Sequence, residues 1–263
     1  MKKYIILSFL LLSAFSLEAQ FRFAFSNEIG VIAGPVAFQS DYGIRHNTGT
    51  NIGNTGMGIA LIHYMNFAYN KACNCYSQDT YFNDHFKFRE ELSFTLVKNL
   101  QHYGEWVADD KNSVTAWQLR GMYGSTSVLN LGVGLEYFPL SIRDFSNGGF
   151  PFAPYISVGG NFGYYNPTAA SHYGQIGTMQ YTPLKYQNNA VTNDNGTVWS
   201  IMANLGVRYK LTRLSDVVLD FKWHYYYSDW VDGLNPRRDV YTENKYNDWQ
   251  FWIGFGYIYY LDF

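Results

Sequence analysis

The chain has 263 residues, a formal net charge of -2 and a mean hydropathy of -0.22. This charge balance excludes the broad basic surface that nucleic-acid binding requires. Beyond residue 19, no stretch approaches the ~20 consecutive apolar residues of a membrane-spanning helix. Aromatic residues nevertheless make up 19% of the chain, and this composition favours a sheet that crosses a membrane.

The N-terminus has the layout of a secretory signal peptide. Lys2 and Lys3 precede a short apolar run, and Ala19 supplies a small residue before a cut. A membrane anchor is the alternative, but the apolar run is short for a helix that spans a bilayer. We therefore expect a signal peptide over residues 1–19 and a single domain over 20–263.

Eight segments of the expected domain show the alternating side-chain pattern of β-strands. They are 27–40, 56–69, 86–97, 127–138, 152–165, 198–211, 216–228 and 248–263. The connections between them alternate in length. In outer-membrane barrels, short turns face the periplasm and long loops face outward.

This rule assigns a side of the membrane to each connection. The expected outer loops are 41–55, 98–126, 166–197 and 229–247, and the inner connections are 70–85, 139–151 and 212–215. Because 70–85 is long for an inner turn, a ten-strand layout with extra strands from 41–55 or 99–125 stays open. A soluble β-sandwich would also alternate. We predict an all-β fold, a transmembrane antiparallel up-and-down β-barrel of about eight strands with long extracellular loops.

Each predicted strand has an apolar face for lipid and a polar face for the lumen. The predicted lumen residues are Lys87, Arg89, Glu91, Ser93, Asn130, Glu136, Asn161, Asn204, Arg208, Asp220, Lys222 and His224. They include both signs of charge, which favours a self-satisfied ion-pair network. In a barrel of about eight strands such side chains fill the interior.

Glu90 breaks this pattern, because it shares the apolar face of its segment with Phe88 and Leu92. We expect it either to lie near the membrane interface or to be turned by a β-bulge.

Catalysis requires a matched base and nucleophile, and the histidines offer few such pairs. Some small outer-membrane barrels, such as lipid A deacylases, place a His and a Ser near the outer rim. His224 and Ser228 share one strand face, but four residues along a strand span ~13 Å. Direct contact is therefore excluded, and a partner from another strand would be required. His63 shows no matched Ser or carboxylate at a useful spacing.

The two cysteines, Cys73 and Cys75, are separated by one residue, and a disulfide across that spacing would be strained. A metal site would need further ligands, for which Asp84 and His85 are the nearest candidates. We expect a structural or incidental role for the cysteines, and no metal, cofactor or catalytic residues.

The last segment carries one unbroken apolar face, formed by Phe251, Ile253 and the final five residues of that face, Phe255, Tyr257, Tyr259, Leu261 and Phe263. It resembles the closing strand of bacterial outer-membrane β-barrels. The resemblance implies that these five residues form the signal that the barrel-insertion machinery recognises.

Several motifs, taken in order, resemble small outer-membrane barrels of Bacteroidota. They are Glu28-Ile-Gly30, Gly34-Pro35, Ser40-Asp-Tyr-Gly43, Asn130-Leu-Gly-Val-Gly-Leu-Glu-Tyr-Phe-Pro139, Phe152-Ala-Pro-Tyr-Ile-Ser-Val-Gly159 and Ser228-Asp-Trp-Val-Asp-Gly-Leu-Asn-Pro236, followed by Asn247-Asp-Trp249. Some members of that group are subunits of the type IX secretion and gliding apparatus. The resemblance thus implies an outer-membrane location and a partner, but no catalytic residues.

We therefore expect a non-enzymatic outer-membrane barrel that acts as a scaffold or accessory subunit, with type IX secretion or gliding as the implied setting. Its expected contacts are outer-membrane lipid and lipopolysaccharide, the barrel-insertion machinery and type IX secretion subunits. The alternatives are an envelope lipid-modifying hydrolase centred on His224 and a small ligand-binding or uptake barrel.

Overall fold

The computed structural model describes residues 25–43, 47–70, 75–241 and 246–261. The predicted signal peptide, Cys73 and Phe263 lie outside the described residues.

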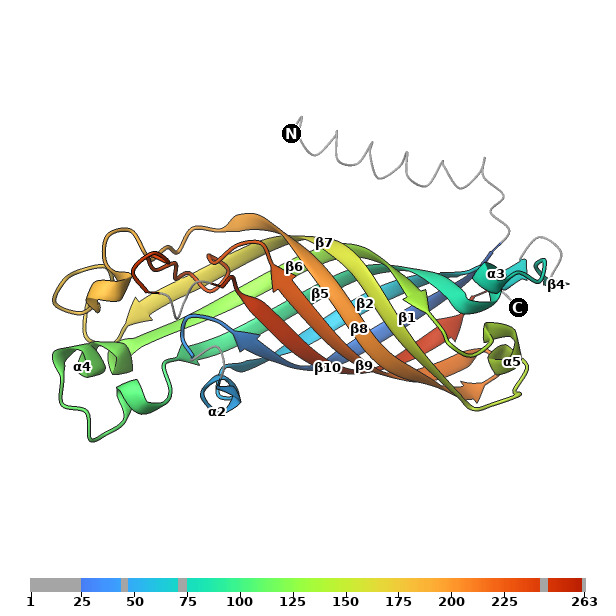
Figure 1. Ribbon diagram of the computed structural model, residues 1–263, viewed down its shortest axis with the longest axis horizontal. Coiled ribbons are helices and arrows are strands. Elements are labelled where there is room, and N and C mark those ends of the chain that lie inside the picture. The colour runs from blue at the N-terminus through green and yellow to red at the C-terminus, as the bar shows by residue number, and fades with distance from the viewer. Residues whose placement is uncertain (1–24, 44–46, 71–74, 242–245, 262–263) are drawn as a thin grey trace, which may run out of the picture.

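Eight long antiparallel strands form a closed barrel, in which the last strand pairs with the first (Figure 1). The strands are β1 (Ser26–Gln39), β2 (Thr55–Asn66), β5 (Phe86–Gln101), β6 (Met122–Tyr137), β7 (Phe152–Ser171), β8 (Gly196–Thr212), β9 (Ser215–Tyr226) and β10 (Trp249–Tyr260). Closure gives the backbone of each strand a partner on both sides, as the bilayer core demands. The predicted fold class and the eight-strand layout are confirmed.

The short elements lie at the two ends of the barrel (Figure 1). At one end are α2 (Thr48–Asn51), η1 (Glu105–Val107), α4 (Val114–Gly121) and η2 (Leu184–Tyr186). At the other are β3 (Tyr69–Asn70), β4 (Cys75–Tyr76), α3 (Tyr81–His85) and α5 (Ile142–Ser146). From the predicted sides of these connections, we name them the outer end and the periplasmic end. Within the described residues, no helix is long and apolar enough to cross a membrane.

The stagger of the strands sets how the barrel closes. Following paired residues once around the sheet leads from Phe86 back to Leu96 on the same strand, a stagger of ten residues. Staggered strands must tilt against the barrel axis, as Figure 1 shows. Eight tilted strands enclose an interior just wide enough for side chains to fill.

Three strands run further toward the outer end than predicted. β5 extends to Gln101, β6 begins at Met122, and β7 extends to Ser171. A register shift between Val97 and Leu100 interrupts the alternation in β5, which hid the extension from sequence analysis. Leu100 and Met122 are buried together, so these extensions belong to a packed outer end rather than to free loops.

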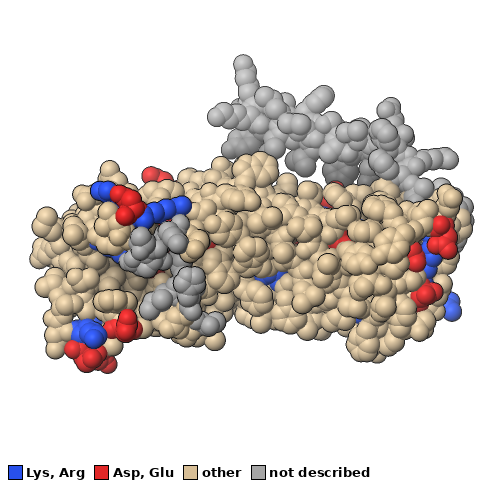
Figure 2. Space-filling view, viewed as in Figure 1, with Lys and Arg blue, Asp and Glu red and all other residues tan. Residues whose placement is uncertain are grey.

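The outward-facing side chains along the middle of the barrel are apolar. Leu131, Val158 and Leu205, for example, are 63%, 59% and 59% exposed. Charged side chains gather at the two ends, and few appear along the flank (Figure 2). An apolar band around a closed barrel is the surface that a bilayer accepts. The chain is therefore a transmembrane β-barrel of the outer-membrane type.

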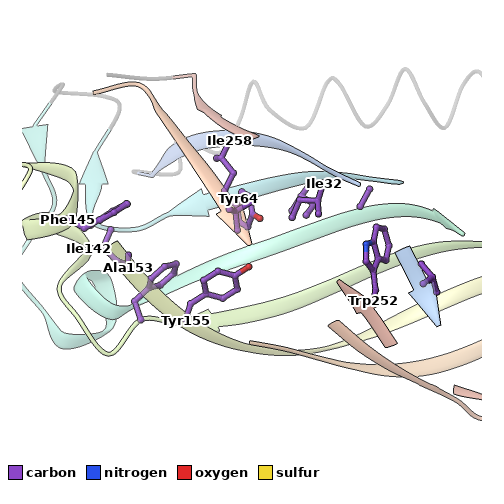
Figure 3. Close-up of a cluster of buried hydrophobic side chains, with 14 residues drawn as sticks. Ile32, Tyr64, Ile142, Phe145, Ala153, Tyr155, Trp252 and Ile258 are labelled. Atoms are coloured by element: carbon purple, nitrogen blue, oxygen red, sulfur yellow. The ribbon is translucent and has the colours of Figure 1, made fainter. Parts of the chain in front are cut away.

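Two buried apolar clusters lie in the interior. The first extends from Ile142 and Phe145 of α5 to Trp252 of β10 (Figure 3). The second joins the outer ends of the strands to Val231 and Leu234, in the loop after β9. Helix α5 and this loop thus each insert apolar side chains into one end of the barrel.

Inward-facing glycines make room for large neighbours. A Cβ atom on Gly206 would lie 2.4 Å from the ring of Tyr155, and one on Gly132 would lie 1.7 Å from Oδ1 of Asn161. A side chain at either position would force its neighbour to move, which explains glycine within these strands.

Substitution of Leu205 by Arg places a charge on the lipid-facing wall near the middle of β8. We expect Leu205→Arg to lower the free energy of unfolding by ~2–4 kcal/mol, the cost of Arg near the bilayer midplane. Tyr209→Arg, on the same face but nearer the periplasmic end, should cost only ~0–1 kcal/mol. Urea titration of the barrel in lipid vesicles measures both, and equal losses would contradict the assigned depths.

Candidate functional site

Eight charged side chains form a belt across the lumen in the periplasmic half of the barrel. The belt consists of Glu28, Glu91, Glu136, Asp220, Lys87, Arg89, Arg208 and Lys222, none more than 1% exposed. Four carboxylates face four cations, so the formal charges of this charge belt cancel. Buried charges are tolerated when they are paired and hydrogen-bonded in this way.

One half of the charge belt is organised by Arg208. Its guanidinium donates to Glu28 at 2.7 Å and to Glu136 at 2.8 Å. Lys87 donates to the other oxygen of Glu28 at 2.6 Å. The Arg208 guanidinium also lies 4.2 Å from the centroid of the Tyr64 ring, a cation–π contact. Each carboxylate oxygen of Glu28 therefore has its own cationic donor.

The other half is organised by Arg89. It donates to Glu136 at 3.0 Å, to Asp220 at 3.0 Å and to Glu91 at 2.6 Å. Lys222 completes the belt by donating to Glu91. Since Glu136 binds both arginines, the eight charges form one continuous network rather than separate pairs.

The charge belt contains a residue that sequence analysis missed. Glu28 lies on β1, whose inward face also carries Ile32 and Val36, so both faces of this strand are largely apolar. The only signal in the sequence was that Glu28 alternates with the outward residues Ile29 and Val31 and therefore faces inward. Its role becomes clear only from its contacts with cations on other strands.

His224 is buried in the lumen beside the charge belt. Its Nδ1 lies 3.1 Å from Nε2 of Gln250, and its side chain has no exposure. Ser228 lies beyond the end of β9, where its Oγ accepts a hydrogen bond from the backbone of Trp230. The structure therefore does not bring the considered catalytic pair together.

The loop after β9 is hydrogen-bonded to the outer end of the barrel. The backbone N–H of Asp41 donates to Asp232 at 2.8 Å, and the Tyr186 hydroxyl donates to the Asp41 carbonyl at 3.0 Å. The Asp248 carboxylate accepts from the N–H groups of Val231 and Asp232 at 3.0 and 3.2 Å. Burial, reinforced by the Asp41 carboxylate, raises the pKa of Asp232 well above its usual value. These contacts hold the loop in place over the lumen.

His102, directly after β5, packs against aromatic rings at the same outer end of the barrel. Its ring lies 5.0 Å from the Tyr42 ring and 5.7 Å from the Tyr186 ring, centroid to centroid. Burial, together with the cation of Lys185, lowers the pKa of the His102 imidazole. The neutral ring is thus the form that fits this packing.

The two long inner connections pack on one another at the periplasmic end. Arg143 of α5 lies 3.3 Å from Asp84 of α3, and its guanidinium lies 5.4 Å from the centroid of the Tyr76 ring. The Tyr76 hydroxyl donates to Asn147 at 2.6 Å. We call this assembly of α3, α5 and β4 the periplasmic platform.

Aromatic rings line one side of the periplasmic rim. Phe82 lies 5.3 Å from Phe67 and 5.0 Å from Phe86, and Phe86 lies 5.2 Å from Tyr137. Tyr81 is 64% exposed next to this row, and its hydroxyl is hydrogen-bonded to that of Tyr137. This row of rings, which Tyr81 borders, marks the membrane interface.

A polar cluster lies on the outer wall of β1, β2 and β5. His63 Nδ1 is 3.1 Å from Glu90 Oε2, and His63 Nε2 is 3.0 Å from Asn27 Oδ1. The prediction that His63 has no matched carboxylate is wrong, because His63 and Glu90 are directly opposite each other across the β2–β5 pair. Spacing along the chain does not show such a relation. The register around Glu90 is regular, so no bulge turns it inward.

The residues of the proposed insertion signal lie on the outer face of the barrel. Phe255, Tyr257, Tyr259 and Leu261 are between 45% and 64% exposed, and Phe263 lies outside the described residues. Their role in insertion remains a prediction.

Cys75 is disulfide-bonded, whereas Cys73 lies outside the described residues. In the part of the chain that the structure describes, no group of three or more His, Cys, Asp or Glu side chains has the arrangement of a metal site.

No protein-family model and no curated protein matches the chain. Among solved structures, it is similar to a major outer membrane protein from Thermus thermophilus, with 13% identity, TM-score 0.46 and coverage of 90% of this chain and 100% of that one. Neisserial surface protein A matches with 11% identity, TM-score 0.43 and coverage of 89% and 96%. OprG from Pseudomonas aeruginosa matches with 13% identity, TM-score 0.41 and coverage of 91% and 99%. At these identities and TM-scores, the similarities give no information about the function of this chain.

Removing one cation from the charge belt should destabilise the barrel strongly. Arg208→Met leaves Glu28 and Glu136 each without one donor in a buried site, which should cost ~3–5 kcal/mol of unfolding free energy. Arg237→Met is the control, since the Arg237–Asp239 pair is exposed on both sides and should contribute nothing measurable. Urea unfolding in lipid vesicles measures both, and a small loss for Arg208→Met would show that the belt is not energetically coupled.

His102 should make the outer end sensitive to acid. Its pKa is lowered in the folded state, so below about pH 6.5, the ordinary value for His, the unfolded segment binds more protons than the folded one. The contribution of His102 to the stability of the outer end should therefore fall as the pH drops from 7 to 5, and His102→Phe should remove that contribution. Limited proteolysis of the outer loops at each pH measures it, and identical pH profiles for the two proteins would exclude this role for His102.

Proposed function

We propose that this outer-membrane barrel is a non-enzymatic scaffold or accessory subunit, and that it serves type IX secretion or gliding. The setting rests on the resemblance of its motifs to Bacteroidota barrels. The observation that carries the scaffold role is the packed lumen. The charge belt and the two apolar clusters occupy the interior, so the surfaces left for contacts are the two ends and the wall.

The periplasmic platform is the surface best suited to a protein partner. Its two connections are held together by Arg143, Asp84, Tyr76 and Asn147, so it is ordered before any partner binds. Tyr81 stands exposed on it. Exposed aromatic side chains on an ordered surface are typical anchors of protein interfaces.

The two alternatives have weaker support. A lipid-modifying hydrolase would need its base within reach of an ester at the membrane, whereas His224 is buried and bonded to Gln250. An uptake barrel would need a path through the lumen, which the charge belt crosses.

Affinity purification of the tagged full-length protein from detergent-solubilised outer membranes tests the proposal. We expect secretion or gliding subunits to be enriched, and Tyr81→Ala to reduce their recovery about tenfold, as loss of an interface anchor does. Trp106→Ala is the matched control, because Trp106 is also 64% exposed but lies at the outer end.

Recovery of the wild-type barrel alone would contradict the accessory role. Altered lipid A mass spectra in a deletion strain would then support the hydrolase, and discrete single-channel conductance would support an uptake barrel.

A further inference from the structure

Glu90 is unusual among the charges of this barrel. Among the outward-facing positions of the eight described barrel strands, it is the single carboxylate, and His63 is the single histidine. The two are hydrogen-bonded to each other on adjacent strands. All the carboxylates of the charge belt, by contrast, face the lumen. We call Asn27, His63 and Glu90 the wall cluster.

The wall cluster lies on the lipid-facing side of the barrel, near the periplasmic ends of β1, β2 and β5. Phe86 and Tyr137, at the start of β5 and the end of β6, belong to the aromatic row that marks the periplasmic interface. Glu90 follows Phe86 by four residues, ~13 Å along a tilted strand and less than that along the membrane normal. A charge inside the apolar band is costly and marks a functional site by default.

In the wall cluster, one carboxylate oxygen of Glu90 is hydrogen-bonded to His63, and the other has no donor among the described residues. His63 engages Oε2, and Asn27 is hydrogen-bonded to the far side of the imidazole ring. Within the described residues no donor reaches Oε1, and the Glu90 side chain is 45% exposed. Ile29, Leu61 and Leu92 surround the cluster and are themselves exposed toward the bilayer. The result is a fixed hydrogen-bond acceptor with a negative charge, set in an apolar surface.

We propose that the wall cluster binds the primary ammonium group of an ethanolamine phospholipid in the periplasmic leaflet. The ammonium supplies a positive charge and several N–H donors, which complement Oε1 of Glu90. The surrounding Ile29, Leu61 and Leu92 side chains contact the acyl chains of the same lipid. A choline headgroup has the charge but no N–H donor, and a glycerol headgroup lacks the positive charge.

Native mass spectrometry of the full-length barrel in detergent tests this site with three probes: phosphatidylethanolamine, phosphatidylcholine and phosphatidylglycerol. We expect phosphatidylethanolamine to bind most tightly, and Glu90→Gln to weaken its binding about tenfold, as loss of one charge-assisted hydrogen bond does. Glu105→Gln, which removes an equal charge from an exposed position at the outer end, should bind like the wild type. If Glu90→Gln does not fold, the relative binding of the three lipids to the wild-type barrel tests the proposal by itself.

Equal retention of the three lipids, or unchanged ethanolamine-lipid binding in Glu90→Gln, would overturn the proposal. A wild-type dimer that Glu90→Gln dissociates would also overturn it and would assign the wall cluster to contact with a second copy of the chain.

Discussion

The bilayer core offers no water to a backbone N–H or C=O group, and the architecture of this chain follows from that constraint. A sheet satisfies it only by closing on itself, so β1 must pair with β10 across the whole span. Closing eight staggered strands in turn fixes a narrow interior. Every inward side chain must then be accommodated by its neighbours across the lumen, which is why inward glycines such as Gly206 lie against large rings such as Tyr155.

A narrow closed interior leaves buried charges few ways to be satisfied. The charge belt does so with equal numbers of carboxylates and cations and with carboxylates that are shared between two cations, as Glu136 is between Arg89 and Arg208. Such a network ties together strands that are not neighbours in the sheet, because Arg208 of β8 reaches Glu28 of β1. The charge belt therefore links opposite sides of the barrel through ion pairs, and such a network is poorly suited to a gate that must open.

Much of this fold could be predicted from the sequence because a strand has a period of two and the two solvents differ sharply. Because lipid lies outside the barrel and packed polar groups lie inside it, Leu205 can be assigned to the outer face and Asn204 to the inner face without knowledge of their contacts. The failures share one cause. The register shift near Val97 hid the outer extension of β5, and the pairing of His63 with Glu90 depends on the register between two strands. The spacing of residues along the chain determines neither the register between two strands nor the contacts across the lumen. The partners of Glu28 could therefore not be predicted either.

The packing of the lumen bears on where such a protein can act. Both ends are closed by elements that are themselves hydrogen-bonded in place: α5 by Arg143 with Asp84, and the loop after β9 by Asp232 with Asp41. A filled interior of this kind leaves little space for side chains to rearrange between one end and the other. The surfaces that this packing leaves for contacts are the two ends and the wall. Glu90 is the one carboxylate among the outward positions of the eight described strands, so its presence on this wall calls for a ligand more than for packing.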